Sequence, residues 1–432
     1  MKVYLRTFGC RANHYDTEAV RAMIETSGHA VVDSVADADV AVFNSCAVTS
    51  DAEAELRKVV RRASREHPRL RSVVMGCAAA LDDDRPVALQ MRSLPSVDHV
   101  LGGADLPAIA AALDLTPAGA LRTRVQTSTR ALLRIQDGCD EHCTFCATTM
   151  ARGANRSRSV DELAREAIVL AERHPEIVIT GIHIGTYGAD IGSSLGALMT
   201  RLVRDVPSAR FRLSSIEATE LDDPLVELLV GAPEHLAPHV HAPLQSGSDR
   251  VLRRMGRNWY TSATYCAALE RLAGPLTVLG LGADVIAGFP GETDDDHAAT
   301  IALVERLPFT YLHVFPFSAR PGTAATRMSG QVAPTVARQR AAELRDIAAR
   351  KARAYAARRD GGLADVIVIG PGHAREGMSG DFLTVRPTDA GLARGTRFVA
   401  RLGVEGEGLL ARPVPSASWR MDSLTARGAV RE

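Results

Sequence analysis

Three closely spaced cysteines carry the strongest chemical signal in the chain. Cys139, Cys143 and Cys146 form a CxxxCxxC spacing within the segment Gly138–Cys146. Thiolates at this spacing suit an iron–sulfur cluster, which normally takes four ligands, so one iron would remain open to a substrate or cofactor. A structural zinc site with His142 or a distant residue as fourth ligand is the alternative, but zinc sites usually use two separated cysteine pairs. The spacing therefore favours a cluster with an open iron.

Three further cysteines each follow an apolar run near the N-terminus, at Cys10, Cys46 and Cys77. Runs rich in β-branched and aromatic residues are typical of strands. Helical patterns at 16–27 and 52–66 separate them, which predicts a doubly wound parallel sheet. Ligands of such sheets collect outside the carboxyl ends of the strands, so the three thiols are expected to meet there. A single cysteine of this kind would more often be a buried small hydrophobe, but three in equivalent positions argue against that.

The rest of the chain predicts two more structural parts and a long helix. Six strand patterns between 131 and 317 alternate with helical patterns, which predicts an incomplete β/α barrel with its chemistry at the C-terminal strand ends. Short strands with Gly-rich turns then predict a small β-barrel, a frequent RNA-binding architecture. Cys266 lies alone in a helical pattern and is expected to pack as a core residue. The expected divisions are an N-terminal domain (1–115), a linker (116–130), a core ending in the long helix (131–360), a small barrel (361–415) and a tail (416–432).

Composition excludes several classes of protein. The chain has 432 residues with 51 Lys+Arg and 51 Asp+Glu, and it is 46% hydrophobic and 24% charged, as soluble globular proteins are. It contains no apolar run long enough to span a membrane, and its start lacks the apolar stretch of a secretory signal. We therefore expect a cytoplasmic protein. Disulfides do not persist in that compartment, so the seven cysteines indicate metal or redox chemistry.

The cysteine loop has Phe145 before its last cysteine and opens a β/α barrel, and in this it resembles the radical S-adenosylmethionine (SAM) superfamily. With the three-cysteine N-terminal part and the small C-terminal barrel, the whole chain resembles the methylthiotransferases. The resemblance implies two 4Fe–4S clusters and SAM as cofactors. Cys139, Cys143 and Cys146 would hold the SAM-cleaving cluster, and the three N-terminal cysteines would hold the auxiliary cluster involved in sulfur insertion. The terminal barrel would correspond to the family's RNA-contacting TRAM domain.

Turns at several predicted strand ends resemble the family's SAM-contacting segments. Glycine permits close backbone approach to a ligand, and Ser or Glu can bind ribose hydroxyls or an ammonium group. The alternative is that these segments are ordinary βα turns, which need Gly and Pro in any case. The residues expected to contact SAM are Phe145, Thr180, Gly181, Ser215, Glu217, Gln245 and Asp284.

Two segments, 180–188 and 213–220, are most similar to the MtaB branch of the family. That branch methylthiolates C2 of N6-threonylcarbamoyladenosine next to the anticodon, at position 37 of tRNA. The alternatives are methylthiolation of N6-isopentenyladenosine or of a ribosomal-protein aspartate, and, in another class, a non-catalytic RNA-binding iron–sulfur redox protein. The segment Ala147–Met150 departs from the family pattern, because it replaces the two apolar residues and the proline usually found after the cysteines, and its two threonines make it more polar.

Basic charge is nearly all arginine, and arginine forks suit the phosphates and bases of folded RNA. A solvated helix face is the alternative reading of the basic stretch 327–359 taken alone. When this basic stretch is considered together with the expected barrel, tRNA becomes the favoured partner. We further expect a flavodoxin- or ferredoxin-like electron donor, a sulfur source, a monomeric state and no membrane contact. The residues expected to contact RNA are Arg152, Arg338, Arg345, Arg386 and Arg397.

Overall fold

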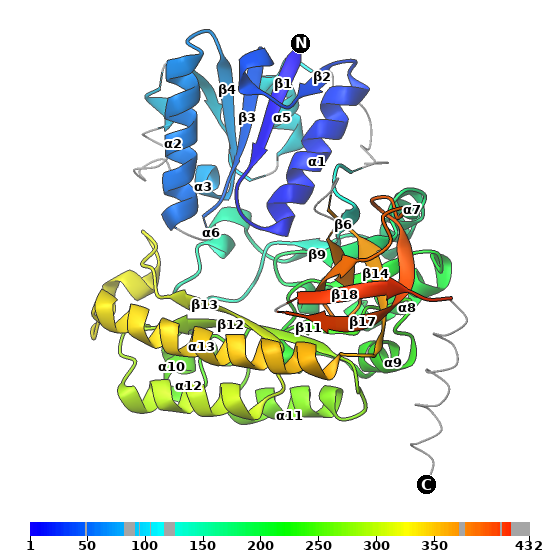
Figure 1. Cartoon of the computed structure of the whole chain (residues 1–432). Helices are drawn as coiled ribbons and strands as arrows, with labels where there is room; N and C mark the ends of the chain where they lie inside the picture. Colours follow the sequence, from blue (N-terminus) through cyan, green and yellow to red (C-terminus); the bar gives the residue numbers. More distant parts are fainter. Residues whose placement is uncertain are drawn as a thin grey trace.

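A computed structural model describes residues 1–47, 50–81, 91–94, 96–103, 105–115, 126–370, 376–406 and 408–415. Most of the expected linker and the whole expected tail lie outside these residues. A blue N-terminal lobe stands above a green-to-yellow strand–helix layer, and a small orange-to-red barrel lies against one side of that layer (Figure 1). Within the described part of the chain, no helix is both long and apolar enough to cross a membrane.

The N-terminal lobe is a parallel sheet with helices on both faces, as predicted. Its strands pair in the order β2-β1-β3-β4-β5. Val20 of α1 and Ile109 of α5 pack on one face, and Leu56 of α2 packs on the other. The short edge strands β2 and β5 were not predicted, because they lack a continuous buried run. The elements are β1 (Lys2–Thr7), α1 (Arg11–Thr26), β2 (Ala30–Val32), η1 (Val35–Asp37), β3 (Val40–Ser45), α2 (Ser50–Glu66), β4 (Arg71–Gly76), α3 (Cys77–Ala80), β5 (Val97–Val100) and α5 (Leu106–Ala112).

The central part is the expected incomplete barrel. Two parallel three-stranded sheets, β10-β9-β6 and β11-β12-β13, are joined by isolated bridges such as Ser215 to His241. Among the described residues no ladder joins β6 to β13, so the wall is open on that side. The strands are β6 (Arg130–Arg134), β7 (Gln136–Asp137), β8 (Arg156–Ser157), β9 (Glu176–Thr180), β10 (Arg210–Leu213), β11 (His239–His241), β12 (Gly280–Ala287) and β13 (Tyr311–Pro316).

Capping residues explain where the helices of this part begin. Ser159, Ser194 and Asp222 each accept a hydrogen bond from the backbone N–H three residues later. Thr261 and Thr293 form reciprocal capping boxes. The short helices α6 and α10 were not predicted, because they contain too few turns to show a period. The helices are α6 (Thr148–Arg152), α7 (Val160–Ala171), η2 (Ile184–Thr186), α8 (Leu195–Asp205), η3 (Ala218–Glu220), α9 (Asp223–Gly231), α10 (Asp249–Arg254), α11 (Ser262–Ala273), α12 (Asp294–Arg306) and η4 (Ala324–Arg327).

The long helix α13 (Pro334–Arg358) leads into a closed five-stranded barrel in the order β14-β15-β16-β18-β17. Its core is small and aliphatic and includes Val366, Val385 and Leu402. The prediction of a small barrel is confirmed, although β15 was missed because it is only three residues long. The strands are β14 (Leu363–Val368), β15 (Gly377–Ser379), β16 (Thr384–Pro387), β17 (Arg397–Glu405) and β18 (Gly408–Pro413).

A fully buried charge cluster joins this barrel to the central sheet. Glu176 of β9 accepts hydrogen bonds from Arg210 Nε at 2.7 Å and Arg212 Nε at 2.9 Å, and all three side chains are 0% exposed. Arg210 also donates to the backbone oxygen of Asp365 at 2.8 Å, and Arg212 donates to that of Ser379 at 2.8 Å. Buried charges are tolerated when they are paired and hydrogen-bonded in this way. The cluster therefore holds the barrel in one orientation.

We expect Glu176→Gln to lower the free energy of unfolding by about 3–5 kcal/mol at pH 7, because it leaves the buried Arg212 guanidinium without a counter-charge, whereas Arg210 keeps Asp365. Burial disfavours the charged carboxylate, but Arg212 and Arg210 outweigh it and lower the pKa of Glu176. The contribution is therefore present above the ordinary carboxyl pKa of about 4.3 and is lost as the pH falls further. Urea unfolding of the wild type and of Glu176→Gln should show a difference in the free energy of unfolding, and this difference should become smaller at acid pH. Glu66→Gln, in an exposed ion pair with Arg62, is the matched control and should cost under about 1 kcal/mol.

Candidate active site between the N-terminal lobe and the barrel

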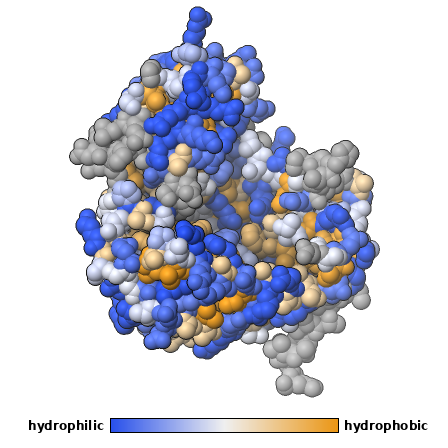
Figure 2. Space-filling view, turned by 60° about the vertical axis from the view of Figure 1, so that its left-hand side comes forward, coloured by the Kyte–Doolittle hydropathy of each residue, from blue (hydrophilic) through white to orange (hydrophobic). Residues whose placement is uncertain are grey.

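A cavity of about 710 Å³ lies where the N-terminal lobe faces the C-terminal ends of the barrel strands. Figure 2 shows a hollow below the upper lobe. Cys77 does not line the cavity but is buried at 3% exposure in the N-terminal lobe. The other expected cluster and SAM residues all line it, namely Cys10, Cys46, Cys139, Cys143, Phe145, Cys146, Thr180, Gly181, Ser215, Glu217, Gln245 and Asp284.

The N-terminal thiols gather around the buried side chain of Asn13. Cys10 and Cys77 each donate a hydrogen bond to Asn13 Oδ1, at 3.8 and 3.6 Å. Asn13 is held in place because its Nδ2 donates to backbone oxygens, including that of Ser45 at 2.7 Å. Gly9 has a φ of +102°, and a Cβ there would lie 2.5 Å from the Cys46 sulfur. These contacts bring three thiols from three strand ends to one place, which is a donor set that fits an iron–sulfur cluster.

The loop thiols are positioned by backbone hydrogen bonds. The N–H of Cys139 donates to the oxygen of Gly153 at 3.0 Å, and that of Cys146 donates to the oxygen of Cys143 at 3.1 Å. The departure segment Ala147–Met150 contributes here, because the N–H of Thr148 donates to the Cys146 sulfur at 3.3 Å. Hydrogen bonds to cysteine sulfurs are a usual feature of iron–sulfur sites, so this contact is compatible with the expected ligand role of Cys146.

A buried arginine contacts each group of thiols, which the sequence did not indicate. Arg152 Nε lies 3.2 Å from the Cys77 sulfur, and Arg257 Nη1 lies 3.7 Å from the Cys143 sulfur. Burial raises the pKa of Cys77 to about 11 and that of Cys143 to about 12, while the adjacent arginine acts in the opposite direction. A buried thiolate cluster carries negative charge, and a fixed guanidinium offsets it. The two sites therefore fit anionic clusters electrostatically.

Arg152 corrects one expectation, because its side chain is only 1% exposed and no RNA phosphate can reach it. It forms ion pairs with Asp16 at 2.7 Å and Asp137 at 3.1 Å, so it links α1 to the barrel. Arg397 is also engaged, with Asp365 at 2.7 Å. Arg338, Arg345 and Arg386 are exposed, and their contact with RNA remains a prediction.

Gln136 is not among the described residues that line the cavity, but it supports a turn that does, and the sequence pattern did not indicate this role. Its Oε1 accepts hydrogen bonds from the N–H groups of Ile182 and His183, both at 2.9 Å, and so shapes the turn after β9. A Cβ at Gly181 would meet this oxygen at 2.8 Å, so the turn requires glycine. Glu217 is held by a bidentate ion pair with Arg257. No local spacing signals these partners, because they come from separate strand ends.

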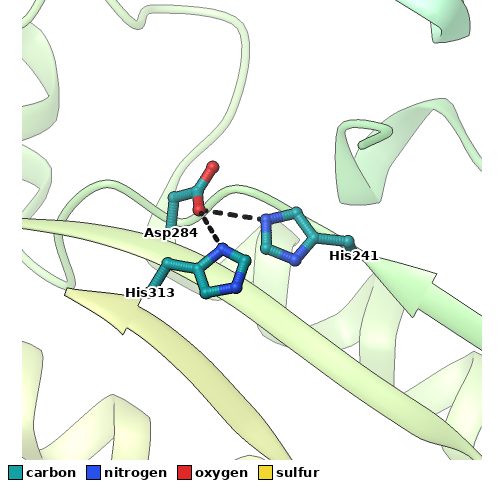
Figure 3. A group of neighbouring side chains, drawn as sticks. All are labelled: His241, Asp284 and His313. Atoms are coloured by element: carbon teal, nitrogen blue, oxygen red, sulfur yellow. Dashed lines mark hydrogen bonds and ion pairs between the residues drawn. The ribbon is translucent and has the colours of Figure 1, made fainter. Parts of the chain in front are cut away.

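Opposite the cysteine loop, three adjacent strands present a polar cluster. His241 Nε2 and His313 Nδ1 both lie near Asp284 Oδ1, at 3.1 and 3.2 Å, and both rings point toward this oxygen (Figure 3). Their three ligand atoms lie within 4.8 Å of one another, so the group could hold a divalent ion. The Tyr311 hydroxyl hydrogen-bonds His239 at 2.8 Å and His241 at 3.0 Å. We call His239, His241, Tyr311 and His313, which all line the cavity, the His–Tyr wall.

Cys266 lies away from these thiols, inside α11 and within the large core cluster at 4% exposure, which confirms its predicted packing role. We expect Cys266→Ala to cost about 1 kcal/mol of stability, since it only trims a packed side chain. Iron analysis of the reconstituted variant should give the wild-type content. A lower content would make Cys266 a ligand or a support of one.

Comparisons with known proteins agree with this architecture. Residues 2–102 match the model of "Uncharacterized protein family UPF0004", and residues 133–304 match that of the "Radical SAM superfamily". A solved structure of the radical SAM methyltransferase TsrM from Kitasatospora setae superposes with a TM-score of 0.54 at 14% identity, covering 73% of this chain and 72% of that one. This likeness shows the fold.

Curated relatives are similar over most of their length. The threonylcarbamoyladenosine tRNA methylthiotransferase MtaB of Bacillus subtilis is 35% identical over 386 residues, which cover 84% of each chain. The tRNA-2-methylthio-N(6)-dimethylallyladenosine synthase of Methylococcus capsulatus is 34% identical and covers 85% of each. With the two domain matches and the two groups of thiols on one cavity, this places the chain in the radical SAM methylthiotransferase family, which includes the MtaB enzymes.

Proposed function

We propose that this protein adds a methylthio group to C2 of N6-threonylcarbamoyladenosine at position 37 of tRNA. The observation that carries the proposal is that two separate groups of thiols meet at one cavity, which five of the six thiols line while Cys77 is buried beside Asn13. The MtaB relatives at up to 35% identity support the choice of base. The domains would be the N-terminal domain (1–115), the radical SAM core (131–360) and a TRAM-like barrel (361–415).

Each group of residues has a role in this proposal. Cys139, Cys143 and Cys146 hold one 4Fe–4S cluster, and Cys10, Cys46 and Cys77 hold the other. When bound, the clusters and SAM supply homolytic bond cleavage together with the sulfur and methyl groups. SAM contacts come from Phe145, Thr180, Gly181, Ser215, Glu217, Gln245 and Asp284.

Other parts of the protein shield the site from water and offset the negative charge of its thiolates. The N-terminal lobe covers the barrel mouth and keeps water from a reactive species formed there. Arg152 and Arg257 offset the negative charge of the thiolates. The target adenine leaves its stack to enter the cavity, as base-modifying enzymes require.

The exposed arginines Arg338 and Arg345 on α13 and Arg386 on β16 bind tRNA phosphates. A flavodoxin- or ferredoxin-like protein donates electrons, a separate source supplies sulfur, and the protein acts in the cytoplasm as a monomer.

The test is mass spectrometry of tRNA nucleosides from a strain that lacks the gene. We expect loss of the methylthio form of threonylcarbamoyladenosine and accumulation of its precursor, both reversed by the wild-type gene and not by a Cys139→Ala gene. If methylthio-dimethylallyladenosine is lost instead, the substrate of the enzyme is dimethylallyladenosine rather than threonylcarbamoyladenosine. A purified holoprotein that binds tRNA but never forms 5′-deoxyadenosine would indicate a redox protein.

A further inference from the structure

Arg11 is an unpaired cation in the cavity. It is the first residue of α1, directly after Cys10, and it lines the cavity from the N-terminal lobe. Within the described residues, no hydrogen bond or ion pair reaches its guanidinium. The other arginine in the described lining, Arg257, is held by Glu217. Arg11 is therefore the cavity arginine with hydrogen-bond donors left for a ligand.

The surroundings of Arg11 show which part of the cavity it serves. Its charge interacts with Arg130 and Glu176, which begin β6 and β9, with Tyr311 and His239 of the His–Tyr wall, and with the neighbouring Cys10. The main electrostatic partners of Cys143 in the cysteine loop are instead Arg257 and Glu217, together with Cys146. Arg11 thus lines the same cavity as the wall on β11–β13, and the groups with which its charge interacts include the wall but not the thiols of the cysteine loop. A partly buried, unpaired guanidinium is costly, and an anionic ligand removes that cost through charge-assisted hydrogen bonds.

The wall itself suits a polar ligand. His313 Nδ1 faces Asp284, and among the described residues His313 Nε2 has no partner. Tyr311, His239 and His241 add further polar atoms. A dimethylallyl group is a pure hydrocarbon and would leave His313 Nε2 and the Arg11 guanidinium unpaired, whereas a threonylcarbamoyl group offers a carboxylate, a hydroxyl and N–H groups.

We propose that Arg11 and the His–Tyr wall form a carboxylate-binding subsite that recognises the threonyl carboxylate of the modified adenine. The Arg11 fork donates two N–H groups to the carboxylate oxygens, and His313 faces the polar remainder of the side chain. The subsite determines which N6 substituent is accepted and takes no part in bond cleavage. This inference rests on the proposed function, because it needs threonylcarbamoyladenosine as the substrate.

The test compares two anticodon stem-loops with the reconstituted holoenzyme. One carries threonylcarbamoyladenosine, and the other carries the same base with its carboxylate converted to a neutral primary amide. We expect the wild type to prefer the acid by about 10- to 100-fold in kcat/KM and in Kd, as for a charged hydrogen-bonded pair. Arg11→Gln should lose that preference, treating both within about 3-fold. Arg11→Lys should keep part of it, because it retains the charge but not the fork.

Controls separate the possible failures. Arg204→Gln, at an arginine whose side chain is 70% exposed on α8, should keep the full preference. A wild type that does not distinguish the two stem-loops overturns the subsite without any variant. The subsite is also overturned if Arg11→Gln keeps the preference for the acid. The same holds if this variant weakens binding of both stem-loops equally, which is the result expected for loss of a phosphate contact. A wild type that modifies neither stem-loop refutes the proposed function instead.

Discussion

Replacing Cys139, Cys143 and Cys146 together by alanine is expected to remove about four irons per chain and to abolish 5′-deoxyadenosine formation. Replacing Cys10, Cys46 and Cys77 together should also remove about four irons, but SAM cleavage should continue while methylthiolation stops. The reason is that the two groups have separate supports. Asn13 accepts from two of the N-terminal thiols, and the loop thiols are held by their own backbone and by Arg257.

The measurement is iron and sulfide content after anaerobic reconstitution, followed by a SAM cleavage assay with a chemical reductant. Cys266→Ala is the matched control and should keep about eight irons. Full iron content in either triple variant would refute that ligand set. Complete iron loss in both variants would show that the two clusters depend on each other.

Replacing Arg152 by methionine is expected to lower the free energy of unfolding by about 3–5 kcal/mol, since it removes the cation from a buried network. Arg152 contacts Asp16 of α1, Asp137 of β7 and the Cys77 sulfur, so three segments lose a shared partner. Methionine preserves length and apolar packing, so the effect reports the charge and its hydrogen bonds. The N-terminal group of thiols should then lose its iron before the loop group does.

Urea unfolding midpoints and iron content after reconstitution check this expectation. Arg152→Lys should have a stability and an iron content between those of the wild type and Arg152→Met, because one ammonium group cannot bridge two carboxylates and a sulfur as the guanidinium fork does. Arg156→Gln, four residues away at 60% side-chain exposure, is the control and should change stability by less than about 1 kcal/mol. Stability unchanged in Arg152→Met would contradict the linking role.

The strands of the N-terminal sheet and of the two barrels show how much of the fold a local sequence pattern can predict. Strands such as β3 and β9 are buried along their whole length and read as continuous apolar runs. The short strands β5 and β15 were missed because tertiary pairing, rather than their own composition, makes them strands.

The cluster chemistry could be predicted from the sequence, because a CxxxCxxC spacing and three cysteines after apolar runs are local features of the chain. The roles of the arginines could not be predicted in this way, because they depend on how the chain folds. Arg152 was expected on the RNA surface and is buried against Cys77, whereas Arg257 and Arg11 carried no signal and line the cavity. The physical reason is that an arginine has the same charge and pattern wherever it lies. Its role depends on partners such as Asp16 and Glu217, which are distant in the chain and are brought to it only by packing.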